Sequence, residues 1–266
     1  MSPLSGFSSV RVADGELWFA DGFEAAAREL GLAEHSRWVS RIEEGIPGGR
    51  GKIAFVESSG RRLALKQLRR GGVAGSIWRD RFSSRERLID NLSIPKLARD
   101  RGVATPAALA LLIVPGPPAW WRGWLAIETV PNAPDLRKRL PTDPPSAAEW
   151  SDALAAVRKL HDAGIEHPDL NLGNVLVDAA GRGWVIDLDR STVHDRPLDI
   201  DRRIDGIRRI ERSYLKTCFV HELPIDTGID WLRLYASKDA SMAERWSQRH
   251  ESDLTKLRRH RRAWRR

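Results

Sequence analysis

Several features that assign proteins to a class are scarce or absent in these 266 residues. The single cysteine, Cys218, cannot close a disulfide within the chain, and its apolar neighbours indicate a small buried hydrophobe in a reducing compartment. The longest apolar run, residues 107–115, is about half of the roughly 20 residues that a membrane span needs. Residues 1–10 lack the cationic stretch and apolar core of a secretion signal. We therefore expect a cytoplasmic protein without a signal peptide or a transmembrane helix.

Zinc chemistry also has little support. The chain has a single cysteine, so no cysteine pair is available to join His167 in a zinc site. No internal repeat or long low-complexity tract is present, and 41% hydrophobic residues in this length suffice for a sizeable core. We expect a folded chain, built either as one domain or as two small lobes around a cleft.

Positive charge is what the sequence has in excess. Lys and Arg number 44 against 36 Asp and Glu, giving a net charge of +8. Most of the excess is arginine, whose planar fork suits phosphate and carboxylate groups. The basic residues cluster at 61–70, 202–216 and 256–266. An anionic partner is implied, and nucleic acid, an anionic membrane face or a phosphorylated substrate would each suit such a surface. For any one cluster, a solvated face without a partner is an equal alternative.

The first half of the chain is predicted to be rich in strands. A glycine-rich turn at residues 45–51 precedes two strands that are joined by a turn at residues 58–60. Asp21 is the expected N-cap of one helix and Gly31 its stop, and a second helix is expected to end near Pro95. The predicted strands are 53–57, 63–68, 109–114 and 124–130, and the predicted helices are 21–30 and 84–97.

The second half is predicted to be mainly helical. Residues 131–145 are rich in proline and polar residues and mark the crossing between the halves. Ser146 and Glu149 form a capping box, and the core helix that follows is expected to stop at Gly164. A loop over 165–174, short strands at 175–177 and 184–186, and a basic amphipathic helix follow; its apolar face carries Ile204, Ile207, Ile210 and Tyr214.

A loop motif in the second half carries the main chemical signal. His167-Pro168-Asp169 is followed by Asn174 five residues after the aspartate, which matches H-R-D-x-x-x-x-N, and Asp187 follows a predicted hairpin. Phosphoryl transfer from ATP needs a carboxylate for the proton of the acceptor hydroxyl and oxygen ligands for Mg²⁺. Asp169 is the candidate catalytic residue, and Asn174 with Asp187 are the candidate metal ligands. His167 is expected to brace the loop.

The upstream half of a kinase pattern is also present. Residues 49–56 follow G-x-G-x-x-G-x-V, with Ala54 in place of the third glycine, and residues 63–66 follow V-A-I-K on a predicted strand. Gly49 and Gly51 would let backbone approach the phosphates of ATP, and Lys66 would hold the α and β phosphates. Glu86 is the preferred ion-pair partner of Lys66, with Glu57 as the alternative. The pattern is not a Walker A motif, because Ile53 stands where Ser or Thr is required.

Each of these pieces has an ordinary structural alternative. Glycines and Asn or Asp form turns, a lysine can be a surface strand residue, and an aspartate can cap a strand end. All of the elements occur in the order and at the spacing of a kinase, which favours the functional interpretation. We predict an α+β, bilobal, protein-kinase-like fold with a small antiparallel-sheet N-lobe and a mainly helical C-lobe. Residues 1–130 would form the nucleotide-binding lobe and residues 131–266 the catalytic lobe with a basic C-terminal segment.

Within kinases, the motifs resemble those of the lipopolysaccharide kinases that phosphorylate 3-deoxy-D-manno-octulosonic acid (Kdo). The resemblance runs from about residue 49 to residue 216 and includes residues 68–72 (Leu-Arg-Arg-Gly-Gly), Asp169-Leu170-Asn171 with Asn174, and residues 186–190 (Ile-Asp-Leu-Asp-Arg). Protein kinases carry Asp-Phe-Gly where this chain has Asp187-Leu188-Asp189, and they usually carry Lys where it has Asn171. Pro168 and the long arginine-rich C-terminal segment depart from the pattern.

The resemblance implies a specific acceptor and place of action. It implies transfer of the γ-phosphate of ATP, with Mg²⁺, to the 4-hydroxyl of Kdo on a lipid A precursor. The enzyme would be a peripheral membrane protein on the cytoplasmic face of the bacterial inner membrane, and the partner of the basic surface would be an anionic glycolipid rather than nucleic acid. Arg69, Arg70 and Arg190 are candidates for contacts with the acceptor or with phosphate.

Two other functions stay open. A kinase of another acceptor, such as a core heptose or a protein, would carry the same motifs; an aminoglycoside acceptor is disfavoured, because a polycation requires an acidic surface. A basic, non-catalytic module of the pseudokinase type would explain the arginines. The second alternative is disfavoured, since such a module has no chemical reason to keep Lys66, Asp169, Asn174 and Asp187 together.

Overall fold

The computed structural model describes residues 4–48, 51–58, 60–70, 80–117, 120–225, 229–236 and 239–249. The chain divides into two compact units. Unit 1 comprises Met1–Leu97 with Pro106–Thr129, and unit 2 comprises Ala98–Thr105 with Val130–Arg266. The sequence predicted a nucleotide-binding lobe at residues 1–130 and a catalytic lobe at residues 131–266. The assignment of these roles to the two parts of the chain stays a prediction.

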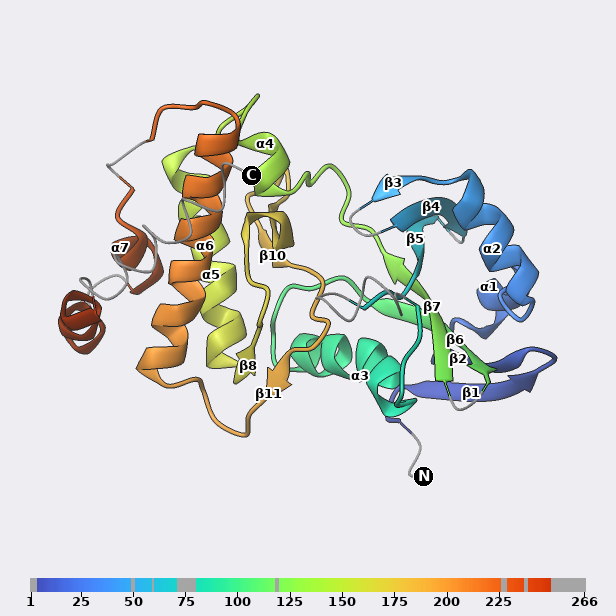
Figure 1. Ribbon diagram of the computed structural model, residues 1–266. Helices are drawn as coiled ribbons and strands as arrows, with labels where there is room; N and C mark the ends of the chain where they lie inside the picture. The colour runs from blue at the N-terminus through green and yellow to red at the C-terminus, as the bar shows by residue number, and fades with distance from the viewer. Residues whose placement is uncertain are drawn as a thin grey trace. The chain divides into compact units, whose positions relative to one another are not determined.

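Unit 1 is built on a seven-stranded antiparallel sheet with the order β1-β2-β6-β7-β5-β4-β3 (Figure 1). The strand pair expected at residues 53–57 and 63–68 is present as β4–β5, and the predicted strands 109–114 and 124–130 correspond to β6 and β7, which pair with each other. Within the turn predicted at residues 45–51, residues 46–48 instead form β3, which pairs with β4. The strands are β1 Phe7–Val12, β2 Gly15–Ala20, β3 Ile46–Gly48, β4 Gly51–Ser58, β5 Arg61–Gln67, β6 Ala108–Gly116 and β7 Trp120–Glu128.

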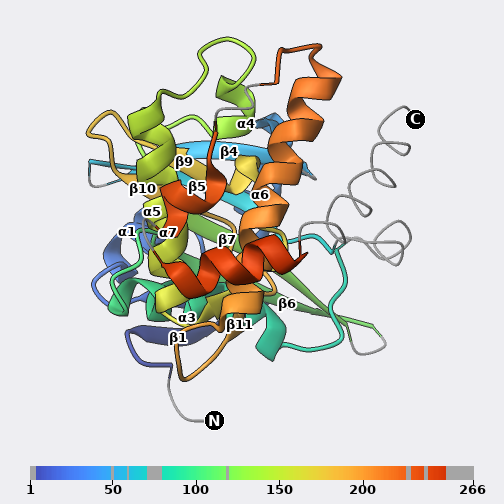
Figure 2. The same ribbon diagram turned by 90° about the vertical axis from the view of Figure 1, so that its left-hand side faces the viewer.

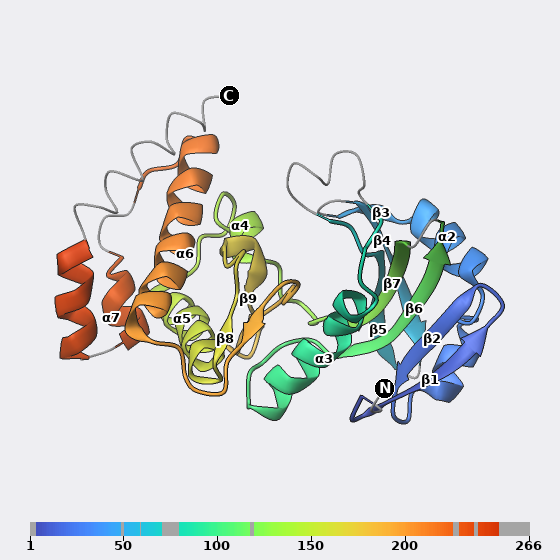
Figure 3. The same ribbon diagram turned by 60° about the horizontal axis from the view of Figure 1, so that its bottom comes forward.

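Helices cover both faces of this sheet, and alternation along the strands explains why. On β2, Leu17 and Phe19 belong to the apolar cluster that also contains residues of α1 (Glu24–Glu29) and α2 (His35–Glu44). Trp18 lies between them in the sequence and belongs to the opposite cluster, with Leu88 and Leu92 of α3 (Glu86–Asp100). Successive side chains of a strand point to opposite faces. Figure 3 shows α1 and α2 on one side of the sheet and α3 on the other.

Two helix predictions in unit 1 were wrong in detail. Helix α1 begins at Glu24 after Phe23, so Asp21 is not its N-cap, although Gly31 follows the helix with a φ of 62° as expected of a stop. Helix α3 does not end near Pro95 but continues to Asp100. Leu92 and Ala98, on either side of the proline, are fully buried, and their packing outweighs the hydrogen bond that proline removes.

Unit 2 pairs two long helices with two small sheets (Figure 2). The capping box predicted at Ser146 and Glu149 is confirmed, as is the apolar face of the basic helix. In the sequence between these two helices lie the 3₁₀ turn η2 (Leu172–Asn174) and the antiparallel pairs β9–β10 and β8–β11. The other elements are α4 Leu136–Arg139, α5 Ala147–Asp162, β8 Ile165–Glu166, β9 Val175–Val177, β10 Gly183–Val185, β11 Thr192–Val193, α6 Ile200–Val220 and α7 Trp231–Ala236.

Close packing fixes α5 against α6 and α7. Gly206 of α6 lies against the imidazole of His161 on α5, so closely that a Cβ at this position would be 2.7 Å from the ring. At the other end, Trp150, Tyr214 and Trp231 form an aromatic cluster with ring centroids 5.3–6.0 Å apart. Cys218 is buried as expected. Among the described residues, no helix is long and apolar enough to cross a bilayer.

Candidate active site

The 167–174 loop holds Asp169 in place by hydrogen bonds from two asparagines. Asn171 Nδ2 donates to the backbone oxygen of Asp169 at 2.8 Å and to its carboxylate Oδ1 at 3.2 Å. Asn174 Nδ2 donates to the same backbone oxygen at 2.8 Å, and Asn171 Oδ1 accepts from the Gly173 N–H. The loop is therefore closed by its own side chains, and the carboxylate of Asp169 stays exposed with a defined orientation.

His167 connects this loop to the strand that precedes Asp187. Its Nδ1 accepts a hydrogen bond from the Asp169 N–H at 3.3 Å, so in the neutral ring the proton lies on Nε2, which faces the Ile186 carbonyl oxygen at 3.3 Å. The ring is buried, and burial lowers the pKa of His167 below its usual value, which keeps the ring neutral. The prediction that His167 braces the loop is confirmed.

Asn174 and Asp187 lie at the open ends of the β9–β10 hairpin. The Ile186 N–H donates to the Asn174 carbonyl oxygen at 3.0 Å, one residue before Asp187. Asp187 itself has a φ of 59°, and Arg190 a φ of 64°, in the left-handed region that costs non-glycine residues about 1 to 3 kcal/mol. Strained backbone of this kind clusters at functional sites, and here it falls on the predicted metal ligand.

The donor set of these residues fits magnesium. Asn174 Nδ2 is engaged with the loop, which leaves the amide oxygen as the group that can bind a cation. In the part of the chain that the structure describes, no cluster of three or more His, Cys, Asp and Glu side chains is arranged to hold a metal. Mg²⁺ usually takes only one or two carboxylates and completes its shell with waters and substrate phosphates, so an amide and carboxylates are sufficient.

The predicted nucleotide residues are in unit 1. Lys66 is partly buried on β5, opposite Ile53 of β4 and Leu125 of β7. Gly51 begins β4, and the guanidinium of Arg69 lies over it: a Cβ on this glycine would be 3.2 Å from Arg69 Cζ. Gly49 lies outside the described residues. The roles predicted for Gly49, Gly51 and Lys66 stay predictions.

The two candidate partners of Lys66 differ in position. On β4, Ile53 lies opposite Lys66, and Glu57 lies four residues further along, opposite Arg62. At the rise of a strand, four residues separate Glu57 from Ile53 by about 13 Å. Glu86 lies in the exposed first turn of α3, where its carboxylate accepts a hydrogen bond from the Ser84 hydroxyl at 2.8 Å. Hydrogen bonds from its own backbone and from Ser84 lower the pKa of Glu86. Its pairing with Lys66 stays a prediction.

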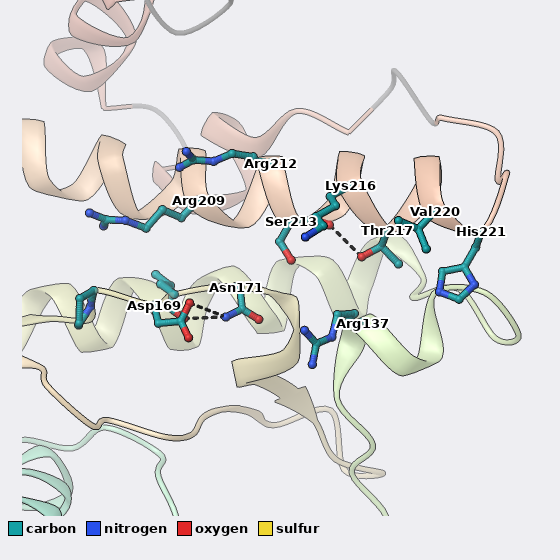
Figure 4. Close-up of a pocket in the computed structure, with 12 residues that line it drawn as sticks. Arg137, Asp169, Asn171, Arg209, Arg212, Ser213, Lys216, Thr217, Val220 and His221 are labelled. Carbon is teal, nitrogen blue, oxygen red and sulfur yellow. Dashed lines mark hydrogen bonds between the residues drawn. The ribbon is translucent and has the colours of Figure 1, made fainter. Parts of the chain in front are cut away.

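A pocket of about 610 Å³ in unit 2 opens beside Asp169 (Figure 4). One face of α6 forms a wall, with residues spaced three or four apart, and α4 contributes Arg137. Figure 4 shows Arg137 directed toward Asn171 from the α4 side and Ser213 of α6 facing the loop. The lining residues are Arg137, Pro168, Asp169, Leu170, Asn171, Arg209, Arg212, Ser213, Lys216, Thr217, Val220 and His221.

Sequence reasoning did not single out the pocket residues. It noted the basic cluster at 202–216 without separating the two faces of the helix. The spacing of Arg209, Arg212 and Lys216 was a usable signal, because positions i, i+3 and i+7 share one helix face. Arg137 lay in the stretch interpreted as a crossing, where a four-residue helix gives no periodic signal.

Comparison with known proteins identifies the relatives of this chain. The model of the lipopolysaccharide kinase (Kdo/WaaP) family matches residues 33–237. The 3-deoxy-D-manno-octulosonic acid kinase of Xanthomonas campestris pv. campestris strain B100 is 30% identical over 192 residues, 71% of this chain and 76% of that protein. The enzyme of the same name from Vibrio cholerae serotype O1 is 31% identical over 191 residues, 70% of this chain and 77% of that protein.

A solved structure shows the same fold. The protein described as WaaP in complex with acyl carrier protein superposes with a TM-score of 0.58 at 17% identity, covering 93% of this chain and 98% of that one. The predicted kinase-like α+β fold is thereby confirmed. With a family model matching more than half of its length and relatives at 30–31% identity, the chain belongs to the lipopolysaccharide kinase (Kdo/WaaP) family and is a phosphotransferase with an alcohol group as acceptor.

Proposed function

We propose that the chain transfers the γ-phosphate of ATP to the 4-hydroxyl of Kdo on a lipid A precursor. The names of the two relatives support Kdo as the acceptor sugar. The observation that carries the proposal is the position of Asp169: its carboxylate is oriented by Asn171 and lines a pocket large enough for a sugar. A base held at the wall of an acceptor-sized pocket is what transfer to a hydroxyl requires.

Asp169 handles the proton in this mechanism. As the acceptor hydroxyl oxygen forms its bond to the γ-phosphorus, the bond from that phosphorus to the oxygen bridging the β and γ phosphates breaks, and ADP leaves. The hydroxyl proton passes to the Asp169 carboxylate. Asn171 and Asn174 hold the loop backbone so that the carboxylate does not turn away, and His167 keeps the loop in contact with the strand before Asp187.

The remaining residues hold the nucleotide. Asn174 and Asp187 would bind Mg²⁺, which when bound neutralises charge on the phosphate oxygens. Backbone at Gly49 and Gly51 would lie against the phosphates, because glycine lets backbone approach them closely. Lys66 would hold the α and β phosphates as a point charge.

The acceptor also defines where the enzyme works. A lipid A precursor is an anionic glycolipid, so the enzyme acts as a peripheral protein on the cytoplasmic face of the inner membrane. The net charge of +8 supports this, since each basic residue near an anionic surface contributes about 1 kcal/mol of attraction.

The acceptor is tested by direct transfer. Purified protein is incubated with ATP, Mg²⁺ and either a Kdo-bearing lipid A precursor, the same lipid without Kdo, a heptose-bearing core acceptor, or a general protein substrate. We expect phosphate only in the Kdo-bearing lipid, with mass spectrometry giving the added mass and phosphorus NMR giving the 4-position. Labelling of the heptose acceptor or of protein, or equal labelling of both lipids, contradicts the choice of acceptor.

The nucleotide half is tested separately. We expect ATP binding to require Mg²⁺ and Asp187→Ala to weaken it at least tenfold, measured by calorimetry without any acceptor. Binding that is independent of Mg²⁺ and of Asp187 contradicts the assignment and favours a non-catalytic module.

A further inference from the structure

The arginines of α6 fall into two groups that differ in their partners. Outside the pocket, near the N-terminal end of the helix, Arg202 pairs with Glu166 at 3.2 Å and with Asp199 at 2.9 Å, and Arg203 pairs with Asp162 at 2.6 Å. Arginines that are neutralised in this way serve the fold of unit 2. Their charge is already satisfied and is not available to a ligand.

The cations of the pocket face differ. Within the described residues, Arg137, Arg209 and Lys216 have neither an ion pair nor a side-chain hydrogen bond, whereas Arg202 and Arg203 have both. Arg209 and Lys216 are seven residues apart, two turns along the same face of α6. Three cations without a carboxylate converge on one pocket.

Among the described residues that line the pocket, Asp169 supplies the single carboxylate, against the cations Arg137, Arg209, Arg212 and Lys216. After burial, the nearby charge of Arg209 is among the causes that lower the pKa of His161 and of His167. A concave surface lined by one sign of charge attracts the opposite charge.

The pocket wall is also joined to the loop that carries Asp169. The Leu172 N–H donates to the Ser213 hydroxyl of α6 at 3.2 Å. Gly173 has no side chain, and the Arg137 guanidinium lies against it: a Cβ there would be 2.8 Å from Arg137 Nη2. These contacts set the cations at a fixed place relative to the Asp169 carboxylate, which a binding site for a reacting sugar requires.

We propose that this pocket is the acceptor site and that Arg137, Arg209 and Lys216 bind an anionic group of the acceptor sugar. Binding of that anion places a hydroxyl of the same sugar against Asp169. The inference rests on the proposed function, since it takes the acceptor to be an anionic glycolipid. The anion is either the carboxylate of Kdo or a phosphate of the lipid, and both have the chemistry that arginine recognises.

This arrangement gives selectivity by charge. A neutral sugar would leave the three cations without an anion, and a polycationic acceptor would be repelled. Specificity for the acceptor would thus come from α4 and α6, and not from the basic cluster at 61–70 in unit 1.

The test compares matched variants of one helix. Arg209→Gln and Lys216→Gln each remove a pocket charge, and Arg202→Gln removes a paired charge outside the pocket. We expect the first two to raise KM for the Kdo-bearing lipid at least tenfold, with KM for ATP within twofold of wild type. Arg202→Gln should leave both constants within twofold. Arg209→Lys keeps the charge and should recover most of the loss.

The chemical source of the anion is tested by modifying the acceptor. The wild-type enzyme is assayed with the Kdo carboxylate converted to its methyl ester and, separately, with the lipid phosphates removed. If the carboxylate is the bound group, the wild-type enzyme should show at least tenfold lower kcat/KM for the methyl ester than for the parent lipid. Arg209→Gln, which has already lost the contact, should show the same kcat/KM for both. If the group is a phosphate, the dephosphorylated lipid behaves in this way instead. Either pattern supports an anion-binding acceptor pocket.

Other outcomes overturn the inference. Equal effects of Arg202→Gln and Arg209→Gln on KM for the Kdo-bearing lipid would show that the overall positive charge of the helix, and not the pocket, attracts the acceptor. Unchanged acceptor KM in folded Arg209→Gln and Lys216→Gln, with thermal midpoints near that of wild type, would place the acceptor elsewhere. Absence of transfer by the wild-type protein to any Kdo-bearing lipid would instead refute the proposed function.

Discussion

The two units hold their candidate site residues by different means. In unit 2, Asp169, Asn171, Asn174 and His167 are joined by side-chain hydrogen bonds within one short loop. In unit 1, Lys66 and Gly51 lie on neighbouring strands of a sheet, and the ladder of backbone hydrogen bonds sets their places. The loop depends on the identity of each side chain, whereas the strands depend on their register.

This difference suggests that the loop orients a catalytic group, whereas the strands position a group that binds phosphate. A proton acceptor must be aimed at one hydroxyl, and aim is lost when a neighbouring amide is removed. A phosphate-binding lysine on a strand needs only its length and its charge. Variants of the loop should therefore lower kcat, and variants of the strands should raise KM for ATP.

Replacement of Asp169 should have the largest effect. We expect Asp169→Asn to lower kcat by about 10²- to 10⁴-fold with ATP affinity unchanged, because the proposed general base is lost while the residues proposed to bind the nucleotide remain. Transfer assays and calorimetry with ATP measure the two quantities. Asp195→Asn, an exposed aspartate in the same unit, is the matched control and should behave as wild type. Near-normal kcat in Asp169→Asn would remove this residue from the mechanism.

Acid should disturb unit 2 through its buried histidines. Burial lowers the pKa of His161 to about 3 and lowers that of His167 as well. A histidine whose folded pKa lies below its unfolded value near 6.5 binds fewer protons when folded, so stability is complete above pH 6.5 and falls as the pH decreases. For His161 the loss by pH 3 is on the order of 5 kcal/mol.

Chemical unfolding at several pH values checks this expectation. The free energy of unfolding should decrease between pH 6.5 and the acid limit, and His161→Gln, which can still bond the Tyr235 hydroxyl, should flatten that decrease. A profile that is the same in both proteins would show that acid acts through other groups.

Removal of the Lys66 charge should act on the nucleotide. We expect Lys66→Ala to raise KM for ATP by about 10- to 100-fold, the range for a hydrogen bond to a charged group, and to leave KM for the acceptor nearly unchanged. Lys96→Ala, on α3 of the same unit, is the control. An increase in acceptor KM of the same size would contradict the division of roles between the units.

The loop asparagine provides a test of orientation alone. We expect Asn171→Ala to lower kcat about tenfold with both KM values within twofold, because its bond to the Asp169 carboxylate is lost while the carboxylate remains. Steady-state kinetics with both substrates measure this split. A rise in KM without a change in kcat would instead make Asn171 a binding residue.

Local sequence signals predicted the features that local chemistry sets. The capping box at Ser146, the glycine stops at Gly31 and Gly164 and the loop around Asp169 depend on residues a few positions apart. Features set by tertiary packing were missed. The β1–β2 hairpin was not predicted, because four of the six side chains of β1 are exposed and give no alternating pattern. Helix α3 continues past Pro95 because Ala98, in the turn after the proline, is fully buried.

The pocket shows the same limit. Sequence reasoning counted charges in the 202–216 cluster, but the ion pairs that neutralise Arg202 and Arg203 reach residues up to 41 positions away. The fold decides which cations form ion pairs with distant residues, and therefore which cations stay available to bind a ligand. A count of basic residues in a stretch of sequence is therefore a weak indication of an anionic partner.

Glu86 should show the smallest effect and decide a role that the sequence left open. Because its carboxylate bonds Ser84 at the exposed start of α3, we expect Glu86→Gln to change KM for ATP less than twofold and to lower the thermal midpoint only slightly. The pKa of Glu86 is lowered in the folded protein, so its contribution is present above pH 4.5 and is lost as the pH falls through the folded value. Ser84→Ala should reproduce the small stability loss. An increase in KM for ATP close to that of Lys66→Ala would instead establish Glu86 as the partner of the lysine when nucleotide is bound.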